Sequence, residues 1–227
     1  MDTSERSWRW KNQYIDLIGS KPEWIIETTK GLPSPEGRAL LQRRAAGYEQ
    51  IVCEVGSGSG GHLIEQARLN PGTLHIGLEL RFKRTFRTAE KAEQAGLSNL
   101  LLLRMNGAVL DQVFEPGSID GVFVNFPDPW DKRRWHRNRL LNPEFLVMLA
   151  TLLRPGGFFS YKTDHAAYFE ETRALLTAVP RFRIEHITTD LHASELAAGN
   201  IMSEFELLFR SQSHPVCALL ARRIEEL

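Results

Sequence analysis

The sequence predicts an α/β protein with a doubly wound, mostly parallel sheet of seven strands. Short apolar runs alternate with stretches of helical spacing along most of the 227 residues. Proline and glycine mark the boundaries between them. Strands joined by helices pair in parallel and are covered on both faces, so their runs are almost wholly apolar. Ligands of such sheets bind beyond the carboxyl ends of the strands, which makes those ends the place to look for a site.

The expected elements follow one another without an internal repeat. Strands are predicted at residues 50–56, 73–80, 99–106, 119–126, 158–163, 181–189 and 204–210. Helices are predicted at residues 37–47, 62–70, 83–96, 166–178 and, closed by Pro-Gly-Gly, 143–157. Residues 1–30 are expected to form an arm or short helices rather than core strands. This divides the chain into an N-terminal segment, 1–44, and a main domain, 45–227.

Composition limits the partners and the compartment. The chain has 28 Lys and Arg against 28 Asp and Glu, so any basic patch must be local. Cys53 and Cys217 lie far apart without metal-ligand spacing, which predicts two reduced thiols and no metal site. The first residues lack an apolar leader core, and no run approaches about 18 uninterrupted apolar residues. We therefore expect a soluble, cytoplasmic protein with no membrane partner.

A glycine-rich loop, EVGSGSGG, follows the first predicted strand at residues 54–61. Glycine lets the backbone turn sharply and approach a ligand, and the helix that follows offers free N–H groups. Gly56, Gly58 and Gly60 give the GxGxG spacing of S-adenosylmethionine enzymes. With Gly61 in place of Gly60, the same loop satisfies the GxGxxG of dinucleotide sites, so the spacing alone leaves both ligands open.

Polar side chains end the first three predicted strands. Glu79 ends the second strand, where a carboxylate can accept hydrogen bonds from the ribose hydroxyls of either ligand. Glu54 ends the first strand, where it would oppose a pyrophosphate but suit the ammonium and sulfonium of S-adenosylmethionine. Asn106 ends the third strand, where its amide either reads an adenine edge or only makes a turn. Together these residues favour S-adenosylmethionine over NAD.

The fourth strand runs into Pro127-Asp128-Pro129-Trp130 and then into a basic segment, residues 132–139, which we call the basic track. The prolines fix φ, so Asp128 is expected to be held in place. Trp135 and His136 lie among five cations: Lys132, Arg133, Arg134, Arg137 and Arg139. A charge run alone is usually a solvated face, but cations mixed with aromatics suit RNA phosphates and stacked bases.

With these motifs assembled, the chain resembles the tRNA (guanine-N7)-methyltransferase family over roughly residues 45–215. The resemblance rests on EVGSGSG (54–60), GLE (77–79), FPDPWDKRRWHRNRL (126–140), LRPGG (153–157), KTD (162–164) and GNIMSEFE (199–206). The proline-framed aspartate with its basic tail is far more specific than the glycine loop. The resemblance implies a class I S-adenosylmethionine-dependent methyltransferase fold, which is Rossmann-like.

The resemblance also implies S-adenosyl-L-methionine as the cofactor, S-adenosyl-L-homocysteine as its product, no metal, and tRNA as the partner. The residues expected to bind the cofactor are Glu54, Gly56, Gly58, Glu79, Asn106 and Asp128. The residues expected to bind tRNA are Lys132, Arg134, Arg137, Arg139, Asp164, Ser203, Glu204, Phe205 and Glu206. Asn106-Gly107 stands where Asp-Ala is usual, which keeps an acceptor but loses a charge. Trp135-His136 also departs from the usual pair, so which of the two faces RNA stays open.

The implied reaction is methylation of N7 of a variable-loop guanine, guanine 46 of tRNA. Because N7 carries a lone pair and no proton, the reaction needs alignment of the reactants rather than a general base. We expect Asp128 to be the catalytic residue, stabilising the positive charge that moves into the purine, with Asp164 as second choice. Trp130 or Phe205 either stacks on the displaced base or packs in the core.

Other functions stay open on sequence alone. One is methylation of a different RNA or of a protein amide, although Asn125-Phe126-Pro127-Asp128 departs from the (Asn/Asp)-Pro-Pro-(Tyr/Phe) turn of amide and adenine methylases. Another is an NAD-dependent oxidoreductase, for which no Tyr-x-x-x-Lys hydride site is evident. A third is a non-catalytic RNA-binding protein, against which the retained acids argue. The oligomeric state, monomer or homodimer, is not indicated.

Overall fold

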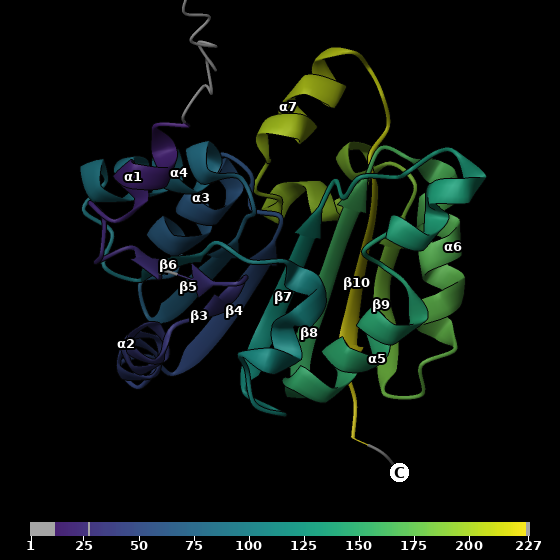
Figure 1. The fold of residues 1–227 in the computed structure, drawn as a ribbon. Helices are drawn as coiled ribbons and strands as arrows, with labels where there is room; N and C mark the ends of the chain where they lie inside the picture. Colours follow the sequence, from purple (N-terminus) through teal and green to yellow (C-terminus); the bar gives the residue numbers. More distant parts are fainter. Residues whose placement is uncertain (1–11, 27, 226–227) are drawn as a thin grey trace, which may run out of the picture.

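The computed structural model describes residues 12–26 and 28–225 (Figure 1). Residues 1–11, 27 and 226–227 lie outside the described part, and with them Trp8 and Trp10 of the expected N-terminal arm. None of the helices in the described part of the chain is long and apolar enough to cross a membrane.

The main sheet has the strand order β1-β6-β5-β4-β7-β8-β10-β9. β10 is antiparallel to both its neighbours, and the other pairs are parallel. The strands of the main sheet are β1 (Ile25–Ile26), β4 (Gln50–Val55), β5 (Thr73–Leu78), β6 (Leu100–Leu103), β7 (Ile119–Asn125), β8 (Leu153–Thr163), β9 (Phe182–Thr188) and β10 (Cys217–Arg223). The predicted doubly wound, mostly parallel sheet is confirmed, with eight strands in place of seven.

The helices alternate with these strands as the spacing predicts. The α-helices are α1 (Tyr14–Ile18), α2 (Pro35–Ala45), α3 (Gly61–Leu69), α4 (Phe82–Gln94), α5 (Pro143–Leu152), α6 (Ala166–Thr177) and α7 (Glu204–Ser211). Short 3-10 turns are η1 (Gly107–Gln112), η2 (Arg133–Asn138), η3 (Leu191–Ala193) and η4 (Glu195–Gly199), and β2 (Thr28–Thr29) pairs with β3 (Leu32–Pro33).

The predicted strand at 204–210 is wrong, because this segment is helix α7 and the last strand, β10, follows it. Alternating apolar and acidic residues from Glu204 onward imitate a strand. The Ser203 hydroxyl, however, accepts a hydrogen bond from the Glu206 N–H (3.1 Å) and starts a helix. This Ser-x-x-Glu spacing is that of a helix capping box. The local cap therefore outweighs the period-two pattern.

Two further strand limits differ from prediction. The edge strand β1 lies in the segment expected to hold no core strand, where Ile25 and Ile26 pair with the end of β6. β8 begins at Leu153 rather than 158, because Leu153 pairs with Ile119 and the Pro-Gly-Gly that follows forms an irregularity inside the strand. Gly156 permits this with a φ of +79°.

Helices cover both faces of the sheet, and side chains alternate between two apolar cores. On one face, Leu102 of β6 packs in a cluster with Phe86 of α4. On the other face, Leu103 belongs to the larger cluster that contains Leu149 of α5. This two-sided burial leaves the edge formed by the carboxyl ends of β4, β5 and β7, next to α7, for a site (Figure 1).

His75 on β5 makes the stability of this core depend on pH. It is 2% exposed, and its Nε2 has no hydrogen-bond partner among the described residues. Burial, with a smaller effect from His62 and an opposing one from Glu54, lowers the pKa of His75 to about 4. The unfolded chain takes up this proton near pH 6.5. The contribution of His75 to the free energy of unfolding is therefore complete above about pH 6.5. It falls by about 3 kcal/mol as the pH drops to about 4.

Denaturant unfolding of the wild type and of a His75→Leu variant between pH 4 and pH 7 checks this. Leucine fills much of the space and cannot be protonated, so the pH dependence should flatten in the variant. Equal slopes in the two proteins would assign the acid sensitivity to other groups.

Candidate active site

The site forms where the strand order reverses, between β4 and β7. Glu54, near the end of β4, and Asn125, at the end of β7, lie side by side, and the Asn125 Nδ2 donates to Glu54 Oε1 (3.1 Å). His62, in the first turn of α3, lies 3.0 Å from Glu54 Oε2 through its Nδ1. Both carboxylate oxygens of Glu54 are therefore oriented by protein groups, at the topological position where doubly wound sheets bind ligands.

The hydrogen bonds of His62 fix its tautomer. Its Nε2 lies 3.3 Å from the Gln66 amide nitrogen, which is a donor, so Nε2 accepts and Nδ1 carries the proton given to Glu54. The ring is 3% exposed and packs edge-on against Phe123 with a centroid distance of 4.8 Å. His62 thus behaves as a fixed donor behind the Glu54 carboxylate.

The glycine loop turns through three residues in the left-handed region. The φ angles of Gly56, Gly58 and Gly60 are +76°, +58° and +81°, which other residues adopt only with strain. At Gly60 a Cβ would also meet the Thr88 side chain at 2.3 Å. The loop then enters α3, whose first N–H groups have no partners inside the helix.

Glu79 braces this loop from the next strand. Its Oε2 accepts from the Gly58 N–H (3.1 Å) and its Oε1 accepts from the Arg81 N–H (2.8 Å). Arg84 Nη1 lies 3.8 Å from the same carboxylate. Since a carboxylate has about four acceptor positions, Glu79 can hold the loop and still accept from a ligand.

A cavity of about 170 Å³ opens beside Glu54 and the glycine loop, and Glu79 lies behind the loop, outside the lining. Its lining contains Glu54, Gly56, Ser57, Gly58, Ser59, Gly61, His62, Arg84, Asn125, Ser203, Glu204, Phe205 and Leu208. Two lining atoms, Ser57 Oγ and Asn125 Oδ1, are buried without a hydrogen-bond partner among the described residues. Buried polar atoms are normally paired, so these atoms indicate a ligand with polar groups.

The far wall of the cavity is the start of α7, anchored by a buried ion pair. Lys162 at the end of β8 donates to Glu206 Oε2 (2.9 Å), to Asn200 Oδ1 (2.6 Å) and to the Ile201 carbonyl (2.9 Å). Glu206 is fully buried. Burial lowers the pKa of Lys162, and the charge of Glu206 opposes that shift. The pair holds the predicted RNA-binding segment 203–206 against the sheet.

The Asp128 turn lies beside the cavity rather than in its wall. The turn is entered and left through two residues with positive φ, Phe126 (+50°) and Trp130 (+48°). The Phe126 ring stacks on Phe209 of α7 at 5.5 Å. Asp128 is exposed, and no hydrogen bond or ion pair engages its carboxylate within residues 12–26 and 28–225. Its charge is therefore available to a substrate.

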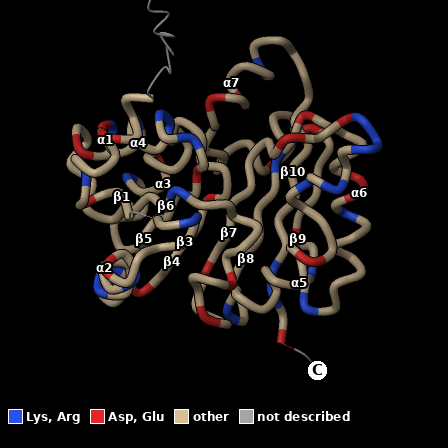
Figure 2. The backbone as a smooth tube through the Cα atoms, in the orientation of Figure 1, with Lys and Arg blue, Asp and Glu red and all other residues tan. Residues whose placement is uncertain are grey.

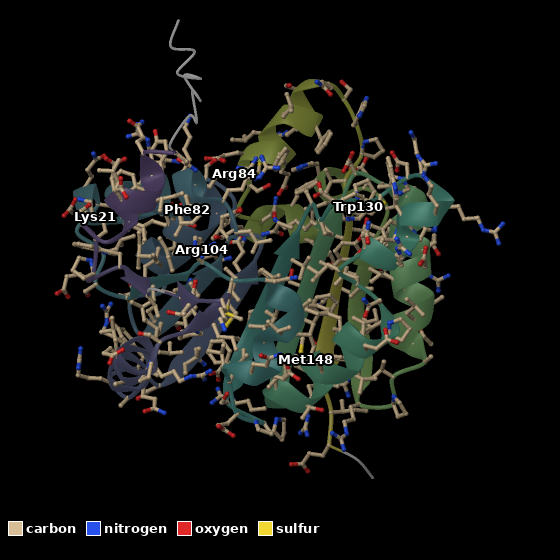
Figure 3. All side chains as sticks on the ribbon, viewed as in Figure 1. Lys21, Phe82, Arg84, Arg104, Trp130 and Met148 are labelled. Atoms are coloured by element: carbon tan, nitrogen blue, oxygen red, sulfur yellow. The ribbon has the colours of Figure 1, made fainter. Side chains whose placement is uncertain are left out.

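The basic track presents most of its cations to solvent. Lys132 and Arg134 both lie over the Trp135 ring, at 4.8 Å and 5.0 Å from its centroid. Trp135 also meets Trp130 edge-on at 6.1 Å. Arg137 is exposed as well. Figure 3 shows Trp130 on the side of α7 away from α4, and Figure 2 shows blue backbone segments farther out on that side.

Arg139 differs from its neighbours in the track because it is buried, at 5% exposure. Its Nε donates to the Pro129 carbonyl (2.7 Å), and its Nη1 forms an ion pair with Glu171 of α6. Its guanidinium also stacks over the Tyr168 ring at 4.6 Å. Arg139 therefore ties the Asp128 turn to α6 and does not present its charge to a tRNA phosphate in this structure.

The remaining predicted residues have mixed placements. Asn106 lies away from the cavity lining, and its Oδ1 accepts from the Ala108 N–H as the cap of η1. Asp164 is exposed at the end of β8. Ser203 is engaged as a helix cap and Glu206 with Lys162. Glu204 is exposed at the cavity and pairs with Lys91 (3.3 Å), and Phe205 is exposed there as well. The structure thus gathers Glu54, the glycines and the start of α7, and leaves Asn106 apart.

Sequence reasoning did not assign roles to Asn125, His62 or Lys162. Asn125 ends a strand at the switch point, which is a usable signal. The partners of His62 and Lys162 are 8 and 44 residues distant along the chain. No local spacing identifies such pairs. The described residues contain no group of three or more His, Cys, Asp or Glu placed to hold a metal ion.

Comparison with known proteins gives a family match. A family model described as "Putative methyltransferase" (Methyltransf_4) matches residues 48–219. The tRNA (guanine-N(7)-)-methyltransferase of Lachnoclostridium phytofermentans is 34% identical over 212 residues, covering 93% of this chain and 98% of the relative. That of Limosilactobacillus fermentum is 36% identical, covering 93% and 95%. A bifunctional glycosyltransferase/methyltransferase of Fusobacterium nucleatum is 32% identical over 87% of this chain, which spans 30% of that relative's length.

Solved structures share the fold at lower identity. The 16S rRNA methyltransferase KamB superposes with a TM-score of 0.62 at 19% identity, covering 82% of this chain and 94% of KamB. A 16S rRNA (adenine(1408)-N(1))-methyltransferase from Catenulisporales acidiphilia, solved with S-adenosylmethionine, gives 0.56 at 21% identity, covering 85% and 92%. This likeness establishes the class I methyltransferase fold.

Proposed function

Because this chain belongs to the tRNA (guanine-N7)-methyltransferase family and is an S-adenosylmethionine-dependent enzyme, we propose that it methylates N7 of guanine 46 in the variable loop of tRNA. The proposal rests mainly on one spatial arrangement. The cavity lined with hydrogen-bond acceptors, the Asp128 turn and the exposed cations of the basic track lie at the same edge of the sheet. The same family membership disfavours the oxidoreductase alternative.

The residues at the switch point fit S-adenosylmethionine. Glu54 and the Asn125 Oδ1, which has no hydrogen-bond partner among the described residues, are two acceptors at one wall, which suits an ammonium group. Glu79 and Ser57 would hold the nucleoside hydroxyls beside the glycine loop, where the backbone approaches closely. When bound, S-adenosylmethionine supplies a methyl group on a positively charged sulfur. A pyrophosphate would meet the Glu54 carboxylate instead, which is unfavourable.

The protein's part in the reaction is positioning and electrostatics. N7 of guanine has no proton to remove, so no general base is required at that atom. The Asp128 carboxylate faces solvent beside the cavity and would stabilise the positive charge that develops on the purine. Arg139 would hold the turn that carries Asp128, through the Pro129 carbonyl. Lys132, Arg134 and Arg137 would hold the phosphates, with Trp135 between them as a stacking face.

The different burial of the arginines predicts two distinct phenotypes. Replacing the exposed Arg134 and Arg137 with Gln should raise the tRNA KM about tenfold or more, because two phosphate contacts are lost, and should leave kcat within about twofold. Replacing Arg139 with Gln should instead lower kcat, because the Asp128 turn loses its tie to α6. Steady-state kinetics at several salt concentrations separate the two. If the Arg139 variant instead raised only the tRNA KM and reduced its salt dependence, Arg139 would be a phosphate-binding residue like Arg134 and Arg137.

The function is tested by incubating purified protein with labelled S-adenosylmethionine and unmodified tRNA transcripts, then mapping the labelled nucleoside. We expect N7-methylguanosine at tRNA position 46, and none in a transcript with adenine at that position. Label on ribosomal RNA but not on tRNA would show that the substrate is ribosomal RNA and not tRNA. Absence of label on any RNA would contradict the proposed function.

A further inference from the structure

A second cationic surface lies on the other side of the cavity from the basic track. Arg81 and Lys83, at the start of α4, are exposed, and Arg104, just beyond β6, is half-buried. No carboxylate lies within ion-pair distance of these three side chains in the part of the chain that the structure describes. Figure 2 shows Lys and Arg positions at α4 on one side of α7 and in the basic track on the other. We call Arg81, Lys83 and Arg104 the α4 surface.

The cations at the N-terminus of α4 lower the stability of this helix. The positive end of the helix dipole lies at the N-terminus, so acids stabilise the first turn and cations destabilise it. α4 has no acidic residue in its first turn and no side-chain cap, and Arg81, Lys83 and Arg84 are crowded there. Glu79, just before the helix, supplies a negative charge there through its hydrogen bond to the Arg81 N–H (2.8 Å), but α4 itself offers none to offset its three cations. Such a departure from a local rule is expected at functional positions. The chain's zero net charge makes the local excess more distinctive.

Aromatic rings lie beside two of the three cations. The Arg104 guanidinium stacks on the Phe82 ring at 4.1 Å, and Lys83 lies 6.0 Å from the centroid of the Tyr14 ring. Stacking restricts the side chains without neutralising them, so the charges face outward in a defined arrangement. This repeats the composition of the basic track, in which Lys132 and Arg134 flank Trp135.

Arg84 places the α4 surface next to the reaction site. It lines the cavity and lies 3.8 Å from Glu79, one helical turn from Arg81. Figure 3 shows Phe82, Arg84 and Arg104 on the α4 side of α7 and Trp130 on the opposite side. An RNA whose guanine reaches the cavity therefore has cationic surfaces on both sides.

We propose that Arg81, Lys83 and Arg104 bind the RNA backbone on the α4 side of the cavity, so that tRNA is held by two separate phosphate-binding surfaces. This rests on the proposed function, since the RNA is the tRNA substrate. The α4 surface acts on RNA affinity and on the orientation of the RNA, and it takes no part in methyl transfer. None of its three residues lines the cavity.

The test compares a triple variant, Arg81→Gln with Lys83→Gln and Arg104→Gln, with a matched control that removes three cations elsewhere: Arg43→Gln, Arg173→Gln and Arg183→Gln on α2, α6 and β9. A double variant that keeps Arg104 guards against loss of its packing on Phe82. Binding of labelled tRNA is measured by filter retention from about 50 to 300 mM salt. Methylation kinetics and S-adenosylhomocysteine affinity are measured on the same proteins.

The triple variant should raise the tRNA Kd and KM about tenfold or more and reduce the salt slope by about 2 to 3, since each lost phosphate contact removes about 1. Its kcat and S-adenosylhomocysteine affinity should stay within about twofold, and the control should match the wild type. Equal tRNA affinity and salt slope in the triple variant and the control would overturn the α4 surface as an RNA site. A wild type that binds tRNA but does not methylate it would instead refute the proposed function and leave the binding result standing.

Discussion

Asp128→Asn is expected to lower kcat for tRNA methylation by about 10²- to 10³-fold, which is the usual effect of removing one well-placed electrostatic group. Asparagine keeps the shape and removes the charge. Asp128 is exposed and has no protein partner in the described residues, so the substitution should not disturb folding. It is also absent from the cavity lining, so affinity for S-adenosylhomocysteine should change by less than about threefold. Single-turnover kinetics and calorimetric titration measure the two quantities separately.

Asp131→Asn is the matched control, three residues along the same loop. Its carboxylate is 73% exposed and pairs with His165 at 2.9 Å, away from the cavity lining. We expect this variant to keep kcat within about threefold. Near-normal turnover in Asp128→Asn would show that Asp128 is not the catalytic residue. Asp164, the second choice, would then become the candidate.

Lys162→Met is expected to lower the free energy of unfolding by about 3 to 5 kcal/mol, because the buried Glu206 carboxylate loses its lysine and keeps only the Asn200 amide and His192 beside its other oxygen. Glu206 is fully buried, and Lys162 also donates to Asn200 and to the Ile201 carbonyl, so three acceptors lose a donor together. The start of α7 should loosen from the sheet. Affinity for S-adenosylhomocysteine should fall as well, since Ser203, Glu204 and Phe205 line the cavity.

The double variant Lys162→Met with Glu206→Leu separates charge from packing. Replacing both members of a buried pair by apolar groups is often close to neutral, so we expect most of the stability to return. Urea unfolding of the wild type, both single variants and the double variant completes the cycle. Equal losses in the single and double variants would mean that packing of α7, rather than the uncompensated Glu206 charge, sets the stability.

The parts of the fold that follow from local rules could be predicted from the sequence. Alternating apolar strands and helices gave the doubly wound sheet, and the glycine spacing gave a loop whose three left-handed residues only glycine adopts easily. The segment after Ser203 could not be assigned from its pattern alone, because alternation and a capping box predict different structures. The capping hydrogen bond to Glu206 decides for the helix.

The site could be predicted only where one strand end determines it. Glu54 and Glu79 end neighbouring strands, and parallel pairing brings them to one edge. Arg139 could not be distinguished from Arg137 in this way, because the sequence around the two arginines gives no sign that only Arg139 is buried. Arg139 is buried because it contacts Tyr168 and Glu171 of α6, and these contacts form only in the packed tertiary structure.

Helix α7 bounds both halves of the site. Its N-terminal end lines the cavity through Glu204, and Phe209 further along stacks on Phe126 at the base of the Asp128 turn. A methyl donor bound in the cavity and an RNA bound at the turn would therefore both contact α7. Thermodynamic linkage makes their influence on each other reciprocal: the factor by which the donor changes tRNA affinity equals the factor by which tRNA changes donor affinity. Through α7, the ratio of S-adenosylmethionine to S-adenosylhomocysteine would therefore change the affinity of the protein for tRNA.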